Sequence, residues 1–178
     1  MGIPSTCQNL EELATPNLGS INQNGRNYML QVGDSAPDFQ GILWNEAEIS
    51  LGQFLGQKVI IYFYPKDNTP GCTTEACDFQ ANLAIFAGQN FAIVGISPDK
   101  NASHKTFSRK YGLTFPLISD PENIISKKYG VWKEKKNYGR TYMGIERTTF
   151  VIDENAIVIA IFPNVRVKGH IQAIIDSI

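Results

Sequence analysis

The chain has 178 residues, enough for one domain with a substantial hydrophobic core. Its 16 Lys and Arg against 17 Asp and Glu give no overall field for nucleic acid or an anionic membrane, and its apolar runs fall short of the roughly 20 residues of a membrane span. Three cysteines and two histidines argue against a disulfide-stapled secreted domain and a structural zinc site, and favour a reducing, cytoplasmic compartment.

Residues 1–30 are rich in Asn, Ser, Pro and Gly and show no sustained hydrophobic period, so they predict a flexible N-terminal extension. This segment lacks the basic start and apolar centre of a secretory signal. Cys7 lies within it, and we expect Cys7 to be a spare thiol. The ordered domain is expected over residues 31–178, starting with a short strand and turn that end near Ser50.

A continuous apolar run at residues 59–64 (Val-Ile-Ile-Tyr-Phe-Tyr) predicts a strand that is buried on both faces of a sheet. The sequence Asn-Thr-Pro-Gly at residues 68–71 is typical of a turn. A helix is expected to begin there, because Thr69 can serve as its N-cap and Pro70 is tolerated at its first position. We expect this helix to run to about Ala87.

Cys72 is therefore expected in or beside the first turn of a helix, at the end of a central strand. The unpaired N–H groups and the positive dipole end of a helix N-terminus lower the pKa of a thiol from its usual value of about 8.5. Glu75, one turn further on, would oppose this effect if it lay close to the sulfur. A cation from elsewhere in the chain is needed to make Cys72 strongly acidic.

Cys77 follows on the same expected helix. In an unbroken α-helix the Cα atoms of Cys72 and Cys77 would be about 8.6 Å apart, beyond the roughly 6.8 Å that a disulfide tolerates. The two thiols can therefore bond only if the helix unwinds locally. From the residues alone, Cys77 is equally compatible with a second redox thiol and with a small buried hydrophobe.

The rest of the chain alternates strands with helices and then forms a hairpin, which predicts an α/β fold with a central mixed β-sheet flanked by helices on both faces. Strands are expected at residues 91–97, 115–119, 148–152 and 157–161, and helices at 101–111, 121–129 and 169–177.

Two other features are expected to be structural rather than functional. His104 and His170 lie far apart near helix starts, where a surface or capping role is more common than metal binding. The charged run at residues 133–136 (Lys-Glu-Lys-Lys) is typical of a solvated loop. The sequence contains no phosphate-binding glycine loop.

The residues around Cys72 match the active-site motif of the peroxiredoxins, Pro-x-x-x-Thr-x-x-Cys, at Pro65, Thr69 and Cys72. The longer string at residues 63–77, Phe-Tyr-Pro-Lys-Asp-Asn-Thr-Pro-Gly-Cys-Thr-Thr-Glu-Ala-Cys, resembles the peroxiredoxin Q subfamily, also called bacterioferritin-comigratory proteins.

Two further segments carry the same resemblance. Residues 144–153, which contain Arg147, are similar to the arginine strand of that subfamily, and residues 32–39 are similar to its opening. The resemblance extends roughly over residues 31–178 and departs at the turn at 44–48, which holds none of the motif residues.

This resemblance implies a thioredoxin-like fold and a peroxidase that uses no metal, haem or flavin. Cys72 would be the peroxidatic thiolate, which attacks a peroxide oxygen and becomes a sulfenic acid. Arg147 would supply the missing cation and stabilise the charge that develops as the O–O bond breaks. Thr69 would hydrogen-bond the thiolate and the peroxide, and Pro65 would shield the site from water. Cys77 would be the resolving thiol.

The resemblance also implies partners. Hydrogen peroxide and organic hydroperoxides would be substrates, and thioredoxin would be the electron donor. An intrachain Cys72–Cys77 disulfide needs no second subunit, so a monomer is expected. Two rival functions are a thiol–disulfide oxidoreductase, which normally uses Cys-x-x-Cys, and a non-enzymatic holdase. Consumption of peroxide far faster than by free cysteine would separate the first function from both rivals.

Overall fold

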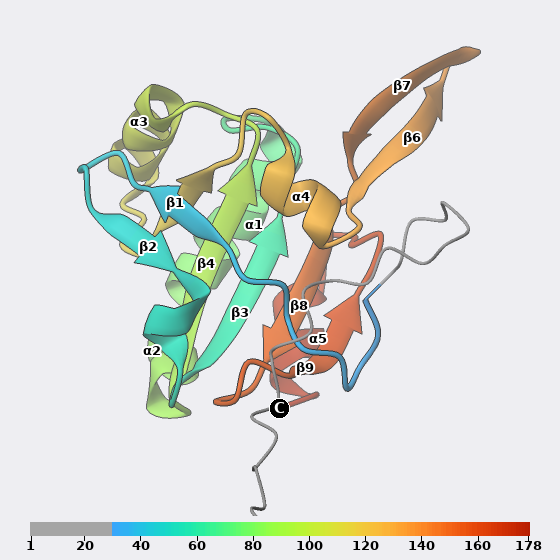
Figure 1. The fold of residues 1–178 in the computed structure, drawn as a ribbon. Coiled ribbons are helices and arrows are strands. Elements are labelled where there is room, and N and C mark those ends of the chain that lie inside the picture. Colours follow the sequence, from blue (N-terminus) through green and yellow to red (C-terminus); the bar gives the residue numbers. More distant parts are fainter. Residues whose placement is uncertain (1–29) are drawn as a thin grey trace, which may run out of the picture.

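The computed structural model describes residues 30–178, which form a central sheet covered on both faces (Figure 1). The strands of this sheet are β3 (Lys58–Phe63), β4 (Phe91–Ser97), β5 (Leu117–Ser119), β8 (Thr148–Ile152) and β9 (Val158–Phe162). They lie in the order β5-β4-β3-β8-β9. β3, β4 and β5 are parallel, whereas β8 is antiparallel to both β3 and β9. The predicted mixed sheet is confirmed.

The central position of β3 follows from its side chains, which are large, hydrophobic and fully buried. Val59, Ile61 and Phe63 belong to one core, and Ile60 and Tyr62 belong to the other. This alternation reflects the two-residue period of a strand. A sheet that carries apolar side chains on both faces has to be covered on both sides.

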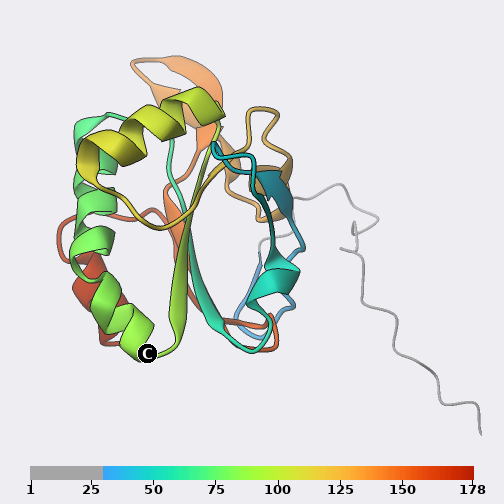
Figure 2. The same ribbon diagram turned by 90° about the vertical axis from the view of Figure 1, so that its left-hand side faces the viewer.

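Each face of the sheet has its own cover, as Figure 2 shows in side view. The first core packs beneath β1 (Gln40–Ile42), β2 (Glu48–Ser50), the 3-10 turn η1 (Leu51–Phe54) and α4 (Ile124–Lys128). The second core packs beneath α1 (Pro70–Ala81), α2 (Leu83–Gly88), α3 (Asn101–Tyr111) and α5 (His170–Ile175). Helices therefore lie on both faces, as the sequence predicted.

Local side-chain chemistry explains where the helices depart from their predicted limits. The helix expected to reach Ala87 is interrupted at Asn82, whose side-chain amide donates to the Asp78 carbonyl at 2.9 Å and competes with the next helical bond. α4 and α5 are shorter than expected because Asn123 and Gly169 precede them in left-handed conformations, with φ of 57° and 79°. α3 has the predicted limits.

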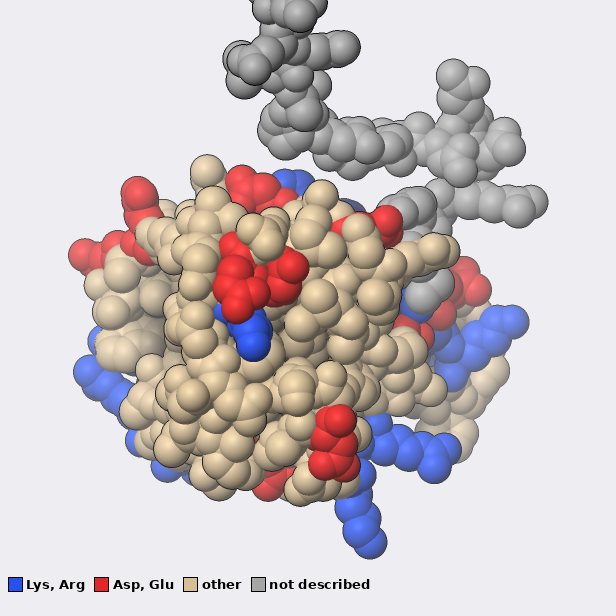
Figure 3. Space-filling view, turned by 90° about the horizontal axis from the view of Figure 1, so that it is seen from below, with Lys and Arg blue, Asp and Glu red and all other residues tan. Residues whose placement is uncertain are grey.

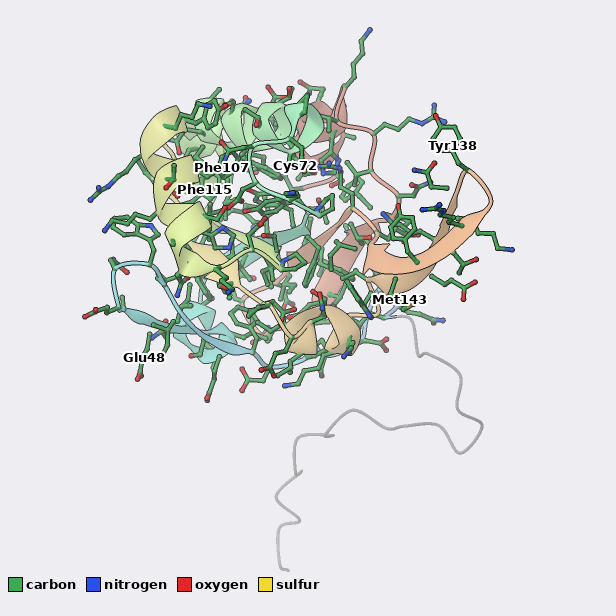
Figure 4. The ribbon with its side chains drawn as sticks, turned by 90° about the horizontal axis from the view of Figure 1, so that it is seen from above. Glu48, Cys72, Phe107, Phe115, Tyr138 and Met143 are labelled. Atoms are coloured by element: carbon green, nitrogen blue, oxygen red, sulfur yellow. The ribbon has the colours of Figure 1, made fainter. Side chains whose placement is uncertain are left out.

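The charged run at residues 133–136 lies in a strand, so the loop expected there was wrong. β6 (Trp132–Asn137) and β7 (Arg140–Ile145) form an antiparallel hairpin that projects from the body of the molecule, with Tyr138 at its tip (Figure 4). Tyr138 and Gly139 have φ of 48° and 75°, which is the twist that two-residue hairpin turns favour. This turn brings β6 and β7 together, although Lys and Glu have a weak preference for strands.

The expectation that both histidines are surface or capping residues was also wrong. His104 is fully buried on the inner face of α3, in contact with the ring of Tyr64. His170 is buried between the rings of Phe79 and Phe162. Both side chains are polar groups inside the second core, so each needs a hydrogen-bond partner.

On the face shown in Figure 3, acidic and basic side chains are scattered among a larger uncharged area. Among residues 30–178, no helix is long and apolar enough to cross a membrane. The same residues contain no group of three or more His, Cys, Asp or Glu placed to hold a metal ion. The expected extension, including Cys7, lies outside the described residues, apart from Leu30.

Candidate active site

Cys72 lies in the first turn of α1, directly after the loop that leaves the carboxyl end of β3 (Figure 4). Thr69 is the N-cap position of this helix and Pro70 is its first residue, as predicted. Only 1% of Cys72 is exposed, and it packs with Ala76 and Phe79 in the second core. Cys72 is therefore a free, buried thiol at the positive end of a helix.

The cation that Cys72 needs is provided by Arg147, from the turn that leads into β8. Arg147 Nη2 donates to Cys72 Sγ at 3.0 Å, and Arg147 Nη1 donates to Glu75. Gly71 lies next to this contact, since a Cβ atom there would be 3.5 Å from Arg147 Nη2, an ordinary van der Waals distance. A guanidinium at this distance can stabilise negative charge that develops at the reacting atoms.

Glu75 is the second buried charge at the site, and it shares Arg147 with Cys72. One of its oxygens, Oε2, is paired with Arg147, whereas Oε1 has no hydrogen-bond partner among the described residues. Burial raises the pKa of Glu75 from 4.5 to about 7, although Arg147 acts in the opposite direction. A protonated Glu75 would leave Arg147 to neutralise the sulfur alone.

Thr69 and Pro65 lie near Cys72 in the chain. Among the described residues, neither forms a hydrogen bond with the Cys72 sulfur. The expected side-chain cap from Thr69 is absent, because its hydroxyl donates to the Lys66 carbonyl at 3.0 Å. The Thr69 carbonyl instead accepts the N–H of Thr73 at 2.8 Å and so begins the helix. Pro65 is exposed at the surface of the loop.

Cys77 lies on the same intact helix and differs from Cys72 in its surroundings. It is partly exposed and free, so the alternative of a fully buried hydrophobe does not describe it. Burial and the neighbouring Asp78 raise the pKa of the Cys77 thiol. The helix therefore carries one thiol beside a cation and a second thiol beside a carboxylate.

Several residues near this site were missed by reasoning from the sequence. Asp67 is buried in the loop before Cys72 and pairs with His104 at 2.9 Å. His170 bonds Thr149 Oγ1 at 2.8 Å, and burial together with Arg147 lowers its pKa to about 4. His104 and Phe107 are three residues apart and so share the apolar face of α3. This spacing is the sequence signal that the His104 side chain faces the core.

The hairpin also reaches the site. Lys135 in β6 is half-buried, and burial together with Arg147 lowers its pKa, whereas Glu146 and Cys72 act in the opposite direction. Lys133, on the same face of the strand, forms an ion pair of 2.7 Å with Glu146. Basic groups in this strand therefore border the active site.

A buried cysteine at the start of the helix after a central strand, with an arginine on its sulfur, is the arrangement expected of a thiol-dependent redox protein built on a thioredoxin-like sheet. The AhpC/TSA family model matches residues 32–161. The chain belongs to this family, as a peroxiredoxin of the Bcp, or peroxiredoxin Q, type. Membership of this class makes the chain a peroxidase.

Relatives and solved structures agree on this assignment. A putative peroxiredoxin Bcp of Coxiella burnetii is 44% identical over 150 residues, which cover 84% of this chain and 99% of that protein. Peroxiredoxin Bcp of Bacillus subtilis is 40% identical, with 84% of this chain and 95% of that protein covered. A cysteine-to-serine variant of Xylella fastidiosa PrxQ gives a TM-score of 0.78 at 35% identity, over 84% of this chain and 94% of that one.

Proposed function

We propose that the chain reduces hydrogen peroxide and organic hydroperoxides through Cys72, Cys77 and a thioredoxin. The observation that carries this proposal is the contact of 3.0 Å between Arg147 Nη2 and Cys72 Sγ at the start of α1. This arrangement supplies what a peroxidatic thiol needs, namely a charge that favours the thiolate and a donor that stabilises negative charge on the departing oxygen.

In the first step the Cys72 thiolate attacks one oxygen of the peroxide. The S–O bond forms as the O–O bond breaks, Cys72 becomes a sulfenic acid, and the departing oxygen takes a proton to become water or an alcohol. Arg147 neutralises the charge that moves from sulfur to oxygen. The Thr69 hydroxyl exchanges its bond to the Lys66 carbonyl for one to the peroxide, and Pro65 covers the reacting atoms against water.

In the second step Cys77 resolves the sulfenic acid. Its thiolate attacks Cys72 sulfur, the S–S bond forms as the S–O bond breaks, and the departing hydroxide takes up the proton that the Cys77 thiol released and becomes water. Since the two Cα atoms are about 8.6 Å apart in an intact helix, this step requires the first turns of α1 to unwind. Thioredoxin then reduces the disulfide by thiol exchange, which restores both thiols and leaves thioredoxin oxidised.

The enzyme would act as a monomer, since both redox thiols come from one chain, and in a reducing cytoplasm, where free cysteines stay reduced. Organic substrates are supported by a relative of known structure. Alkyl peroxide reduction activity is described for the bacterioferritin comigratory protein of Xanthomonas campestris, which is 39% identical to this chain. No metal, haem or flavin has a role in these steps.

The direct test is mass spectrometry of the reduced protein after one equivalent of peroxide. We expect a peptide pair joined through Cys72 and Cys77, together with peroxide consumption that is lost in Cys72→Ser. A matched Cys77→Ser sample should give a sulfenic acid on Cys72 and no disulfide. Peroxide consumption that persists in Cys72→Ser would refute the assignment of the peroxidatic thiol.

A further inference from the structure

A group of buried polar side chains holds the loop that precedes Cys72. The loop comprises residues 64–69, and Asp67 near its middle is only 4% exposed. Its carboxylate accepts three side-chain hydrogen bonds, so both of its oxygens are satisfied. The donors are Tyr64 Oη at 2.7 Å, Ser103 Oγ at 2.7 Å and His104 Nδ1 at 2.9 Å.

The same loop is also held through its backbone. The Asp67 N–H donates to Asp99 Oδ2 at 2.7 Å. Asp99 follows β4 and is itself fixed, since Ser97 Oγ donates to Asp99 Oδ2 at 3.1 Å and Ser119 Oγ donates to the Asp99 carbonyl at 2.6 Å. The loop is thereby joined to the ends of β4 and β5 and to the first turn of α3. We call the group the loop anchor; its members are Tyr64, Asp67, Asp99, Ser103 and His104.

The energetics of the loop anchor depend on every donor being present. Burial would raise the pKa of Asp67, but the hydrogen bond and the electrostatic attraction of His104, together with hydrogen bonds from Ser103 and Tyr64, outweigh burial and leave this pKa below its ordinary value. Asp67 is therefore a buried, ionised carboxylate. Removing the Tyr64 hydroxyl would leave its Oδ1 without a partner, whereas removing Ser103 or His104 would leave Oδ2 with a single donor. His104 uses only Nδ1 here, since its Nε2 has no partner among the described residues.

We propose that the loop anchor positions Cys72 for reaction with peroxide, with Asp67 and His104 as positioning residues. The anchored loop carries Thr69, whose carbonyl starts α1, and it therefore fixes the backbone N–H groups around the sulfur. Arg147 approaches from the other side, at the start of β8. The contact between Cys72 and Arg147 thus joins two separately held segments, and its geometry depends on the anchor.

This inference rests on the proposed role of Cys72, and it predicts a loss of rate that exceeds any loss of fold. A displacement of about 1 Å at a reacting group can cost up to about 100-fold in rate, so partial loosening should cost about tenfold. If the network only stabilised the fold, removing one of its members would lower the melting temperature and leave the rate of each folded molecule unchanged.

Two tyrosines provide a matched test. Tyr64 and Tyr129 are both 1% exposed, and each donates one hydroxyl hydrogen bond, to Asp67 at 2.7 Å and to the Pro37 carbonyl at 2.9 Å. We expect Tyr64→Phe to lower the second-order rate of Cys72 oxidation by hydrogen peroxide about tenfold. Tyr129→Phe should lose stability of the same order and keep a rate within about twofold of wild type.

Substitutions of the histidine supply the second readout. Asn places an amide nitrogen where His104 has Nδ1, whereas Leu fills similar space without a donor. We expect His104→Leu to slow Cys72 oxidation and to reduce the thiolate absorbance of the folded protein at neutral pH, and His104→Asn to restore most of both. Should His104→Leu fail to fold, Ser103→Ala removes a milder, partly exposed donor to the same carboxylate.

The outcomes separate this inference from the function on which it rests. Slow oxidation in Tyr64→Phe and His104→Leu, with rescue by His104→Asn, supports a positioning role. Wild-type oxidation rates in both variants, with melting temperatures lowered as in Tyr129→Phe, would show that the anchor only stabilises the fold. Peroxide turnover that survives Cys72→Ser would overturn the proposed function itself, whatever the anchor variants do.

Discussion

Two buried carboxylates flank Cys72, and the protein satisfies them in opposite ways. Asp67, in the loop before the cysteine, accepts three side-chain hydrogen bonds and has a lowered pKa. Glu75, in the helix after it, has one partner in Arg147, an oxygen without a partner among the described residues, and a pKa raised to about 7. The same chemical group is a firm anchor on one side and a weakly held charge on the other.

This difference indicates which side of Cys72 can move. Opening the start of α1 breaks helical hydrogen bonds in a segment that contains Gly71, Thr73 and Thr74, all weak helix formers, together with one ion pair at Glu75. Opening the loop would break the three side-chain hydrogen bonds of Asp67 and its N–H bond to Asp99, and would leave the buried His104 without its partner, which is a larger penalty. Resolution by Cys77 should therefore unwind the helix and leave the loop in place.

Removing Cys77, the thiol for which the helix has to open, should have the largest effect on turnover. In Cys77→Ser the first peroxide is reduced at Cys72, but no thiol on the helix can resolve the sulfenic acid, so we expect thioredoxin-coupled turnover to stop after one cycle. Stopped-flow measurement of the first turnover, followed by the steady state, would check this. Sustained wild-type turnover in this variant would place the resolving thiol outside α1.

The next largest effect concerns the cation shared by the helix and the sulfur. Arg147→Gln removes the charge that lies 3.0 Å from Cys72 Sγ, so we expect the rate of peroxide reduction to fall by about 100-fold. Arg140→Gln in the exposed hairpin is the matched control and should change the rate less than about twofold. Equal rates in the two variants would remove Arg147 from the reaction.

Hydrogen exchange can test the two sides of Cys72 directly, because each has a reporter amide. The Thr73 N–H is bonded to the Thr69 carbonyl within the helix start, and the Asp67 N–H is bonded to Asp99 within the loop anchor. In the disulfide form we expect exchange at Thr73 to accelerate at least about tenfold, whereas exchange at Asp67 should stay slow. Loss of protection at both amides would show that the loop opens as well.

Much of the fold was predictable because its signals are local. The apolar run of β3 and the alternation of strands with helices specified a mixed sheet, and Gly112 marked the end of α3. The hairpin was not predictable from its charged residues, since β6 and β7 pair only with each other and bury little. The sequence signal for the hairpin was the Tyr138-Gly139 turn, but the run of Lys and Glu before it is more typical of a loop.

The active site was predictable in part for a similar reason. Cys72 could be placed by its chain neighbours, and the need for a cation followed from the position of Glu75. Asp67, His104 and His170 could not be placed, because their roles depend on contacts between segments that are distant in sequence. No local pattern distinguishes a buried histidine on a helix from an exposed one unless the apolar face of that helix is identified first.

The smallest expected effect is a pH dependence of stability in which Glu75 and His170 oppose each other. The pKa of Glu75 is raised from 4.5 to about 7, so in this interval the unfolded chain releases a proton that the folded chain keeps, and stability falls as pH rises. The pKa of His170 is lowered from 6.5 to about 4, so between these values the unfolded chain binds the extra proton, and stability rises with pH.

Between pH 4.5 and 6.5 the two contributions have opposite signs, each at most about 1.4 kcal/mol per pH unit. We expect Glu75→Gln to make stability rise more steeply with pH than in wild type, and His170→Gln to make it fall. Gln preserves the shape of Glu75 and offers Thr149 a nitrogen in place of His170 Nε2. Urea unfolding at several pH values would measure the slopes. Parallel profiles in the three proteins would mean that neither group differs in protonation between the folded and unfolded states in this pH range. Glu75 would then be ionised in the folded protein, as Asp67 is.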